Sequence, residues 1–245
     1  MLISQDDLLE NKEDWIKKMI AQIMSNFSLQ RHPPFPCIFS RKAFQLKLFK
    51  FLPIYYVNDN YDFNALLKGL EDYLELHKNW DGKFTTAYPL LVIFQPIDKL
   101  KDINYCEDLF VSALQYLIDR DSESWEQCEI KDPNKEFWSM QFRNIQLFIN
   151  VSHHNNVNKL SRNLCDTLVF VINPRERFDI FAGNDPKGVF IRDRIRENID
   201  QYDKIKRSPI LGHYLNGDLE WPQYFLPDEN DAEPLQCPLR FKNDK

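Results

Sequence analysis

Three short apolar runs in the middle of the chain have the length and composition of buried strands. Residues 88–95 are almost continuously apolar, which predicts a central strand covered on both faces. Residues 147–151 and 168–172 are rich in β-branched and aromatic side chains, and each run ends at a polar breaker, which is typical of further buried strands. Residues 137–142 are expected to pair with the run at 147–151 as a hairpin across Arg143 and Asn144.

Other segments place apolar residues at the spacing of an amphipathic helix. Residues 14–27 do so, and the proline-rich residues 31–37 end this first helix, because proline cannot donate a helical hydrogen bond. Further helices are expected from about residue 62 to residue 80, over residues 106–118 and over residues 190–202. In the last of these helices Arg192 lies at the edge of the apolar arc.

Residues 37–44 and 48–57 alternate well enough between apolar and polar side chains to predict the two strands of a hairpin. Pro53 lies inside the second of these strands. Because proline has no backbone N–H to contribute to a sheet, its presence indicates an edge strand.

The tail, residues 208–245, is too apolar for disorder and too broken by proline and glycine for regular elements. We expect it to pack as an irregular lid over the functional site, with Trp221, Tyr224 and Phe225 lining that site.

The expected fold class is α+β: a mostly antiparallel central sheet with helices packed against it and a long irregular C-terminal segment. A single domain, residues 1–245, is expected, with the N-terminal helix in its first 30 residues.

Composition and charge disfavour several classes of partner. With 43% apolar and 14% aromatic residues, the 245-residue chain can bury a full core. Its formal net charge of −6 gives no electrostatic basis for binding nucleic acid or an anionic membrane. Five cysteines without a Cys-x-x-Cys pair indicate reduced thiols. The acidic N-terminus and the lack of a long apolar run indicate a soluble, cytoplasmic protein.

The connection between the runs at 147–151 and 168–172 is where we expect chemistry first. It is polar, it contains His153 and His154, and connections of this length are usually functional or disordered. Histidine binds haem iron and most transition metals, so either histidine could be a metal ligand; solvated loop residues are the plain alternative. Cys37 is a third candidate ligand as a thiolate, although a buried inert thiol is the commoner arrangement.

Arginines gather in the second half of an otherwise acidic chain. They are Arg162, Arg175, Arg177, Arg192, Arg194 and Arg196. Ordinary ion pairs with neighbouring acidic residues account for part of this group. The rest suit a site for carboxylates or phosphates, because a guanidinium binds such groups through two parallel hydrogen bonds. No glycine-rich phosphate loop, nucleophile elbow or His-Glu-x-x-His motif accompanies them.

Five segments form an ordered series along the chain: RHPPFPCIFSRKAF (31–44), FINVSHHNN (148–156), SRNLCDTLVFVINPRERFD (161–179), IRDRIRENIDQYD (191–203) and LGHYLNGDLEWPQYFLPDEN with CPL (211–239). Together they resemble the successive blocks of the YqcI/YcgG family. The resemblance implies a haem-dependent N-oxygenase that hydroxylates the side-chain guanidine or amine nitrogen of arginine- or lysine-like amino acids with O₂. Cys165 and Leu215 stand where glycine is usual in the family, which bears on the shape of the substrate pocket.

A haem-dependent oxygenase needs an axial ligand, an apolar cleft and cations for two propionates. The loop histidines, His154 ahead of His153, are expected to supply the ligand. The residues expected to bind the cofactor or a substrate carboxylate are Arg162, Arg175, Arg177, Arg192 and Tyr224. Glu220 and Asp179 are the acidic candidates to bind the substrate guanidinium or ammonium. Electrons are expected from a separate reductase, since no flavin or nicotinamide motif is visible.

A non-catalytic haem- or small-ligand-binding protein is the alternative, and conversion of an amine substrate separates the two. A metal-independent interaction module would show no haem absorption band after expression with haem supplied. The sequence leaves open whether the axial ligand is His153, His154 or Cys37, which substrate is used, and the oligomeric state, a homodimer included.

Overall fold

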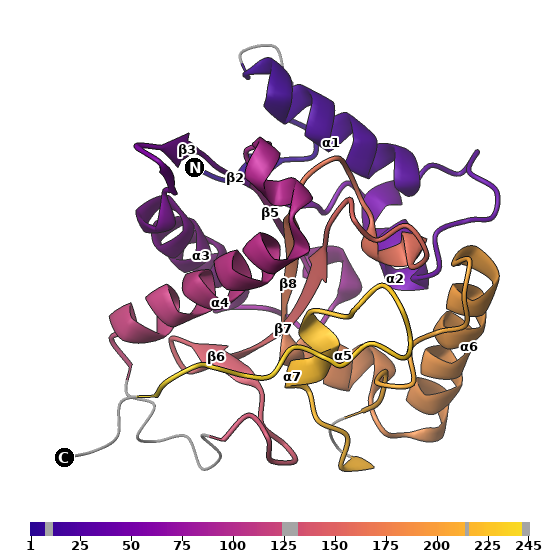
Figure 1. The fold of residues 1–245 in the computed structure, drawn as a ribbon. Helices are drawn as coiled ribbons and strands as arrows, with labels where there is room; N and C mark the ends of the chain where they lie inside the picture. The colour runs from indigo at the N-terminus through magenta and orange to yellow at the C-terminus, as the bar shows by residue number, and fades with distance from the viewer. Residues whose placement is uncertain (8–11, 124–131, 214–215, 242–245) are drawn as a thin grey trace.

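The computed structural model of the chain describes residues 1–7, 12–123, 132–213 and 216–241. In these residues a six-stranded sheet has the order β1-β2-β5-β8-β7-β6 (Figure 1). Its strands are β1 (Ile3–Ser4), β2 (Lys50–Ile54), β5 (Leu90–Phe94), β8 (Val169–Pro174), β7 (Ile145–Ser152) and β6 (Met140–Phe142). Neighbouring strands are antiparallel except β2 and β5, which are parallel. The expected α+β class with a mostly antiparallel sheet is confirmed.

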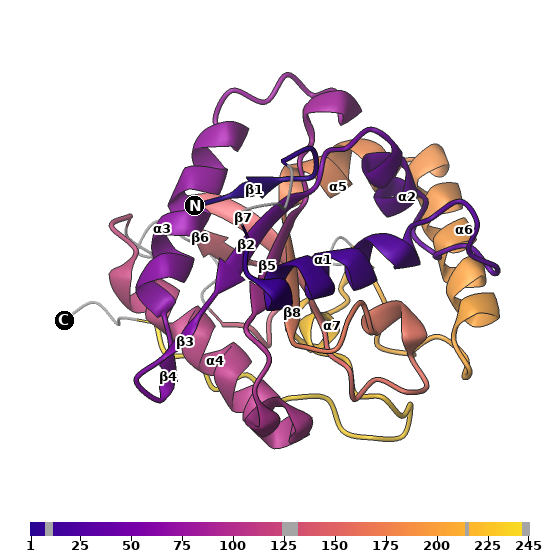
Figure 2. The ribbon, with the colours of Figure 1, turned by 90° about the horizontal axis from the view of Figure 1, so that it is seen from above.

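Helices cover both faces of this sheet (Figures 1 and 2). On one face lie α3 (Phe63–His77) and α4 (Ile103–Arg120), and on the other lie α1 (Asp14–Asn26), α2 (Ile38–Gln45) and α6 (Pro186–Tyr202). The remaining elements are the helices α5 (Arg175–Ala182) and α7 (Trp221–Tyr224), the hairpin β3 (Tyr56–Val57) with β4 (Asn60–Tyr61), and the 3-10 turns η2 (Phe84–Thr86), η3 (Asp98–Lys101) and η5 (Leu160–Arg162). All four amphipathic helices expected from the sequence are confirmed.

The continuous apolar run of β5 is explained by its central position. Leu90, Val92 and Phe94 pack into the core with α3 and α4, while Leu91 and Ile93 pack into a second core with α1. All five residues of the strand are buried. A strand that is covered on both faces has no position for a polar side chain, so the alternation usual in half-exposed strands disappears.

The strand expected at residues 37–44 is wrong, because this segment forms the helix α2. The Cys37 Sγ accepts a hydrogen bond from the Ser40 backbone N–H at 3.4 Å and so caps the helix. Phe39 and Ala43, one helical turn apart, both face the interior cavity described below. The expected hairpin with residues 48–57 therefore does not form, and β2 pairs instead with β1 and β5.

The position of Pro53 also differs from expectation, since β2 lies inside the sheet rather than at its edge. The two-residue strand β1 pairs only with Lys50 and Phe51. Pro53 lies beyond the end of β1, so the missing N–H breaks no ladder on that side. Proline is tolerated here because β1 is too short to reach it. The length of the neighbouring strand cannot be read from the sequence around Pro53.

The hairpin of β6 and β7 forms across Arg143 and Asn144 as expected. Both residues have positive φ, 53° and 59°, which a two-residue turn matching the twist of the strands requires. In the tail, α7 is a single turn and the other described residues from 208 onward are irregular. Cys128 and Leu215 lie outside the described residues, and Cys165 is buried in the core beside α1.

Candidate active site

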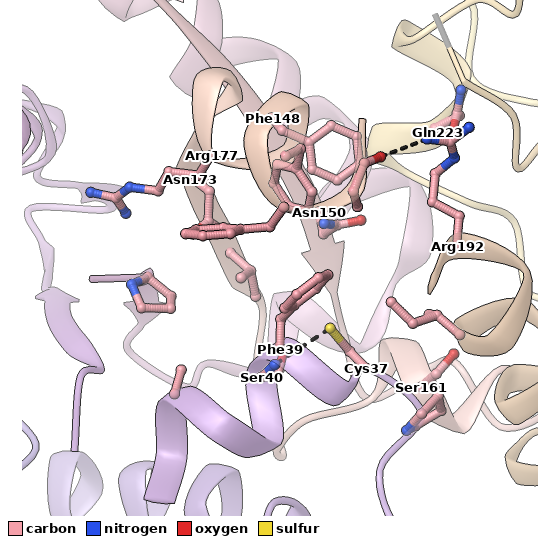
Figure 3. A pocket seen from close by; sticks show the side chains of 18 of the residues that line it. Cys37, Phe39, Ser40, Phe148, Asn150, Ser161, Asn173, Arg177, Arg192 and Gln223 are labelled. Carbon is pink, nitrogen blue, oxygen red and sulfur yellow. Dashed lines mark hydrogen bonds between the residues drawn. The ribbon is translucent and has the colours of Figure 1, made fainter. Parts of the chain in front are cut away.

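A cavity of about 310 Å³ lies on the face of the sheet that carries α2. Its walls come from β7, β8, α2, α5, α6 and the start of the tail. Figure 3 shows Arg177 and Arg192 on opposite sides of this pocket, with Cys37, which caps α2, and Phe39 of α2 facing it. Segments far apart in the sequence therefore meet around one volume, which is within the range usual for small-molecule sites.

The floor of the pocket is made by alternate residues of β7 and β8. Phe148 and Asn150 of β7, and Val171 and Asn173 of β8, line it. Phe148 is paired with Asn173 and Asn150 with Val171, so the four side chains share one face. Residues between them, such as Ile149, point to the opposite face and are buried in the main core. The strands thus separate a packed face from a ligand-facing one.

Aromatic rings from separate elements form much of the wall. Phe39 of α2 lies 6.0 Å from Phe84 of η2, and Phe84 lies 5.4 Å from Phe181 of α5, measured between ring centroids. On the strand side the centroids of Phe148 and Phe178 are 4.7 Å apart. A large apolar or flat ligand would bury against these rings and exclude water from them.

The polar part of the wall is strongly cationic. The five arginines that line the pocket are Arg162, Arg175, Arg177, Arg192 and Arg196, and Glu220 is the one carboxylate among its described lining residues. With histidine neutral, the formal charge of this lining is +4. The structure brings Arg162, Arg175, Arg177, Arg192 and Arg196 together at this pocket, whereas Arg194 is exposed and pairs with Glu197 on α6. Such a wall favours anionic ligand groups.

Glu220 is engaged inside the protein. It forms an ion pair with Arg175, and its Oε1 accepts hydrogen bonds from Ser139 Oγ at 2.8 Å and Tyr224 Oη at 2.5 Å. Glu220 and Arg175 are only 2% and 4% exposed. Because the buried carboxylate already has a cation and two hydroxyl donors, its charge is balanced before a substrate arrives. Its expected role as the partner of a substrate cation stays a prediction.

Arg177 is a buried arginine whose hydrogen bonds to described residues go to neutral groups. Its Nη1 donates to Tyr73 Oη at 3.0 Å and to the Tyr88 carbonyl at 2.6 Å, and in the described part of the chain no carboxylate pairs with it. Its guanidinium also lies 5.8 Å from the ring centroid of Trp80. A buried arginine without an acidic partner is suited to an anionic group of a ligand.

Arg162 and Arg192 donate hydrogen bonds to backbone carbonyls. Arg162 donates to the carbonyls of Gln223 and Tyr224 at the end of α7, and burial lowers the pKa of its guanidinium to about 10. Arg192 donates to the carbonyls of Ala182 and Gly183 at the end of α5. Both line the pocket, but these contacts also tie helix ends together. Their cofactor-binding role stays a prediction.

Asp179 and Tyr224 do not line the pocket. The Tyr224 hydroxyl is fully buried behind the floor, where it accepts the Met140 N–H and contacts Glu220.

Trp221 and Phe225 pack against Phe110 of α4 in the main core. The lining expected of the tail aromatics is therefore not observed, because burial in the core already uses their apolar surface. The tail reaches the pocket instead through Leu211, Gly212, His213, Glu220 and Gln223.

The loop histidines also lie away from the pocket lining. His153 is 2% exposed, and its ring stacks on Phe225 with centroids 5.2 Å apart. Among the described residues, neither ring nitrogen has a hydrogen-bond partner. Burial lowers its pKa to about 4, with positive charge at His154 as the second cause. His154 is half-buried, and burial lowers its pKa as well. Their assignment as metal ligands stays a prediction.

Replacing His153 by Phe should make the haem-free protein less sensitive to acid. A pKa lowered from 6.5 to about 4 means that the folded state favours the neutral ring. The corresponding stability, about 3 kcal/mol, is fully present above pH 6.5 and is lost as the pH falls toward 4. Urea unfolding at pH 7 and pH 4.5 should show a smaller pH difference in the variant. An unchanged difference would mean that His153 does not cause it.

Cys37 and His213 are the pocket-lining residues of the described chain that can ligate iron through sulfur or imidazole. His213 is 7% exposed, and burial together with the positive charges of Arg192, Arg175 and Arg196 lowers its pKa to about 4. The ring is therefore neutral near pH 7, which is the form that binds metals. His213 was one of the isolated histidines in the sequence, without a pattern to mark it.

The fold and the pocket define an α+β protein with a buried, aromatic and arginine-rich small-molecule site. The YqcI/YcgG family model matches residues 23–240, and the chain belongs to this family. It is 39% identical over 242 residues to a Streptomyces lavendulae protein named "Putative N(omega)-hydroxy-L-arginine synthase DcsA", covering 98% of this chain and 90% of that protein.

Two Bacillus subtilis (strain 168) proteins, both named as uncharacterized, are also similar to the chain. YcgG is 28% identical over 211 residues, with 84% of this chain and 81% of that protein covered. YqcI is 30% identical over 216 residues, with 85% and 82% covered. No solved structure matches the chain significantly. Among the described helices, none combines the length and the apolar character needed to cross a membrane.

Proposed function

We propose that this protein is a haem-dependent N-oxygenase that hydroxylates a side-chain nitrogen of an arginine-like amino acid with O₂. The observation that carries the proposal is the pocket: five arginines and one already paired glutamate, set among aromatic walls. The name of the Streptomyces relative supports the choice of substrate. An amino-acid carboxylate and two haem propionates are anions that such a wall would bind.

The residues present fit a haem in three respects. The Phe rings of α2, η2 and α5 provide apolar surface for a macrocycle. Arg177, a buried cation without a carboxylate partner in the described chain, is suited to a propionate or a substrate carboxylate. Cys37 and His213 are the lining residues that would hold the haem iron. When bound, haem supplies the iron at which O₂ is activated.

The chain's own residues would bind, orient and enclose the substrate. Arg177 would fix a carboxylate, and that contact would set the direction of the substrate side chain within the pocket. Phe84 and Phe181 would keep water from the reacting nitrogen. Arg175 would be held in one position by Glu220, whose remaining oxygen is held by Ser139 and Tyr224. Electrons would come from a separate protein donor.

An absorption spectrum and a turnover assay test this proposal. Protein expressed with haem supplied should show a haem absorption band, and with O₂, a reducing system and L-arginine it should form a product heavier by one oxygen atom. A haem band without conversion of arginine or lysine analogues would favour the non-catalytic haem-binding alternative. Absence of the band would overturn the proposed cofactor.

We infer that a haem in this pocket is ligated by Cys37 or His213 rather than by His153 or His154. Of these four side chains, Cys37 and His213 are the two that line the pocket. Either Cys37→Ala or His213→Ala should therefore fail to hold haem. The ferrous–CO spectrum of the wild type separates a thiolate from an imidazole ligand.

His153→Ala and His154→Ala are the matched comparison for this test. Both should retain the haem band, although His153→Ala should be less stable because a cavity replaces a buried ring. Loss of haem in one of them, with Cys37→Ala and His213→Ala unaffected, would return the ligand to the loop and place the haem outside this pocket.

A further inference from the structure

Two asparagines stand in the floor of the pocket on neighbouring strands. Asn150 of β7 and Asn173 of β8 are both half-buried and both line the cavity (Figure 3). Phe148, which lies between them on the same face, is paired with Asn173. In the described part of the chain, neither side-chain amide takes part in a hydrogen bond, an ion pair or a ring contact.

These residues are poor choices for the fold alone. Asparagine is depleted in strands, where β-branched side chains pack best, and the neighbours on β7 and β8 are Ile149, Val151, Val171 and Ile172. An amide at such a position loses packing and gains no hydrogen bond inside the protein. Their presence at two ligand-facing positions therefore indicates a partner that is not part of the chain.

The pocket has many donors and few acceptors. Of the four lining side chains with a carboxylate or amide oxygen, Glu220 is occupied by Arg175, Ser139 and Tyr224. The Oε1 of Gln223 accepts the Gly212 N–H at 3.2 Å. Of these four side chains, Asn150 and Asn173 are the two whose oxygen accepts no hydrogen bond from the described residues. A ligand that carries N–H groups finds its side-chain acceptors here.

We infer that Asn150 and Asn173 bind the nitrogen-bearing head group of the amino-acid substrate and determine specificity for it. This inference rests on the proposed function and replaces Glu220 and Asp179 as the partners of that group. Neutral amide oxygens accept the N–H hydrogens without adding negative charge. A carboxylate at the same place would favour the protonated nitrogen, which has no lone pair for oxygen transfer.

Asn→Val at either position should separate stability from binding. Asn150→Val and Asn173→Val should each raise the midpoint of thermal unfolding, by about 2–4 °C, because valine suits a strand. Each should weaken L-arginine binding about tenfold, the loss expected for a hydrogen-bonded head group left without its acceptor. Gln146→Val is the matched control: Gln146 lies on the same face of β7 but is exposed and outside the pocket, so it should not change binding.

The binding assay uses protein expressed with haem supplied, titrated with L-arginine and with L-norleucine. Norleucine keeps the α-carboxylate and α-ammonium but has no side-chain N–H, so the Asn150→Val/Asn173→Val double variant should lower the ratio of arginine to norleucine affinity. An unchanged ratio, or lowered thermal stability in both single variants, would overturn the inference while leaving the proposed function intact. Wild-type protein that binds no arginine or lysine analogue would overturn both.

Discussion

Replacing Arg175 by Met should lower the free energy of unfolding by about 3–5 kcal/mol, because the substitution leaves a buried carboxylate without its cation. Glu220 is 2% exposed, and its ion pair with Arg175 lies in the wall of the pocket. The hydroxyls of Ser139 and Tyr224 would still donate to one oxygen of Glu220, but they carry no charge. Chemical denaturation at pH 7 measures the loss.

The double variant Arg175→Met/Glu220→Gln should recover most of that stability, since neither charge is then buried alone. The control on the surface is Arg194→Met, whose side chain is 58% exposed and whose partner Glu197 is 57% exposed. Its cost should stay below about 1 kcal/mol. A small loss of stability in Arg175→Met, or no recovery of stability in the double variant, would contradict the interpretation that Glu220 balances the charge of Arg175 rather than binding a substrate cation.

The elements that the sequence predicts well are those whose signal is local and long. The continuous apolar run of β5 and the helical spacing of α3 each follow from burial alone, and Asp62 caps α3 by accepting the Ala65 N–H at 3.0 Å. The turn at Arg143 and Asn144 is fixed by the two strands it joins. In each case one short stretch of chain contains the whole physical reason for the structure.

The elements that were missed depend on distant parts of the chain. Residues 38–45 show a weak alternation, and a thiol cap together with a cavity facing Phe39 and Ala43 makes them helical. The helix α5 is short and begins directly after Pro174, where the sequence predicted only a polar breaker at the end of the run at 168–172. The secondary structure of such segments depends on tertiary contacts, which local sequence patterns do not predict.

The residues of the candidate site also differ in how far the sequence alone predicts their role. Clustering of arginines is visible in the sequence, but the use of Arg162 and Arg192 on backbone carbonyls depends on where two helices end. His153 stands out as a motif, yet the fold buries it against Phe225. Asn150 and Asn173 carry a usable signal, an amide at an inner position of each of two apolar strands, which becomes meaningful once their shared face is known.

The tail is too well anchored for truncation to be a clean test of a lid. Trp221 and Phe225 belong to the main core, so removing the chain from Ser208 would remove part of that core. A narrower anchor joins the tail to the loop after β7. The carboxylate of Asp228 accepts the backbone N–H groups of Asn158 at 3.0 Å and Lys159 at 2.9 Å.

Asp228→Ala should release the end of the tail and cost about 2–4 kcal/mol, because two backbone donors lose their acceptor. The Lys159 ammonium, which donates to the Pro227 and Asp228 carbonyls at 2.6 and 2.8 Å, would also lose the nearby negative charge. Hydrogen exchange should rise first in residues 216–241. Since the tail carries Glu220 and Gln223 to the pocket, ligand affinity should fall with it.

Asp228→Asn keeps one acceptor oxygen and should retain much of the anchoring, whereas Asp231→Ala, at an exposed position of the same tail, should be within about 0.5 kcal/mol of the wild type. Protection of residues 216–241 that is unchanged in Asp228→Ala would mean that the aromatic core alone fixes the tail. The pocket would then keep its shape without this contact, and a loss of affinity in the variant would need another cause. Faster exchange together with weaker binding would instead mean that the loop after β7 controls the site by holding the tail.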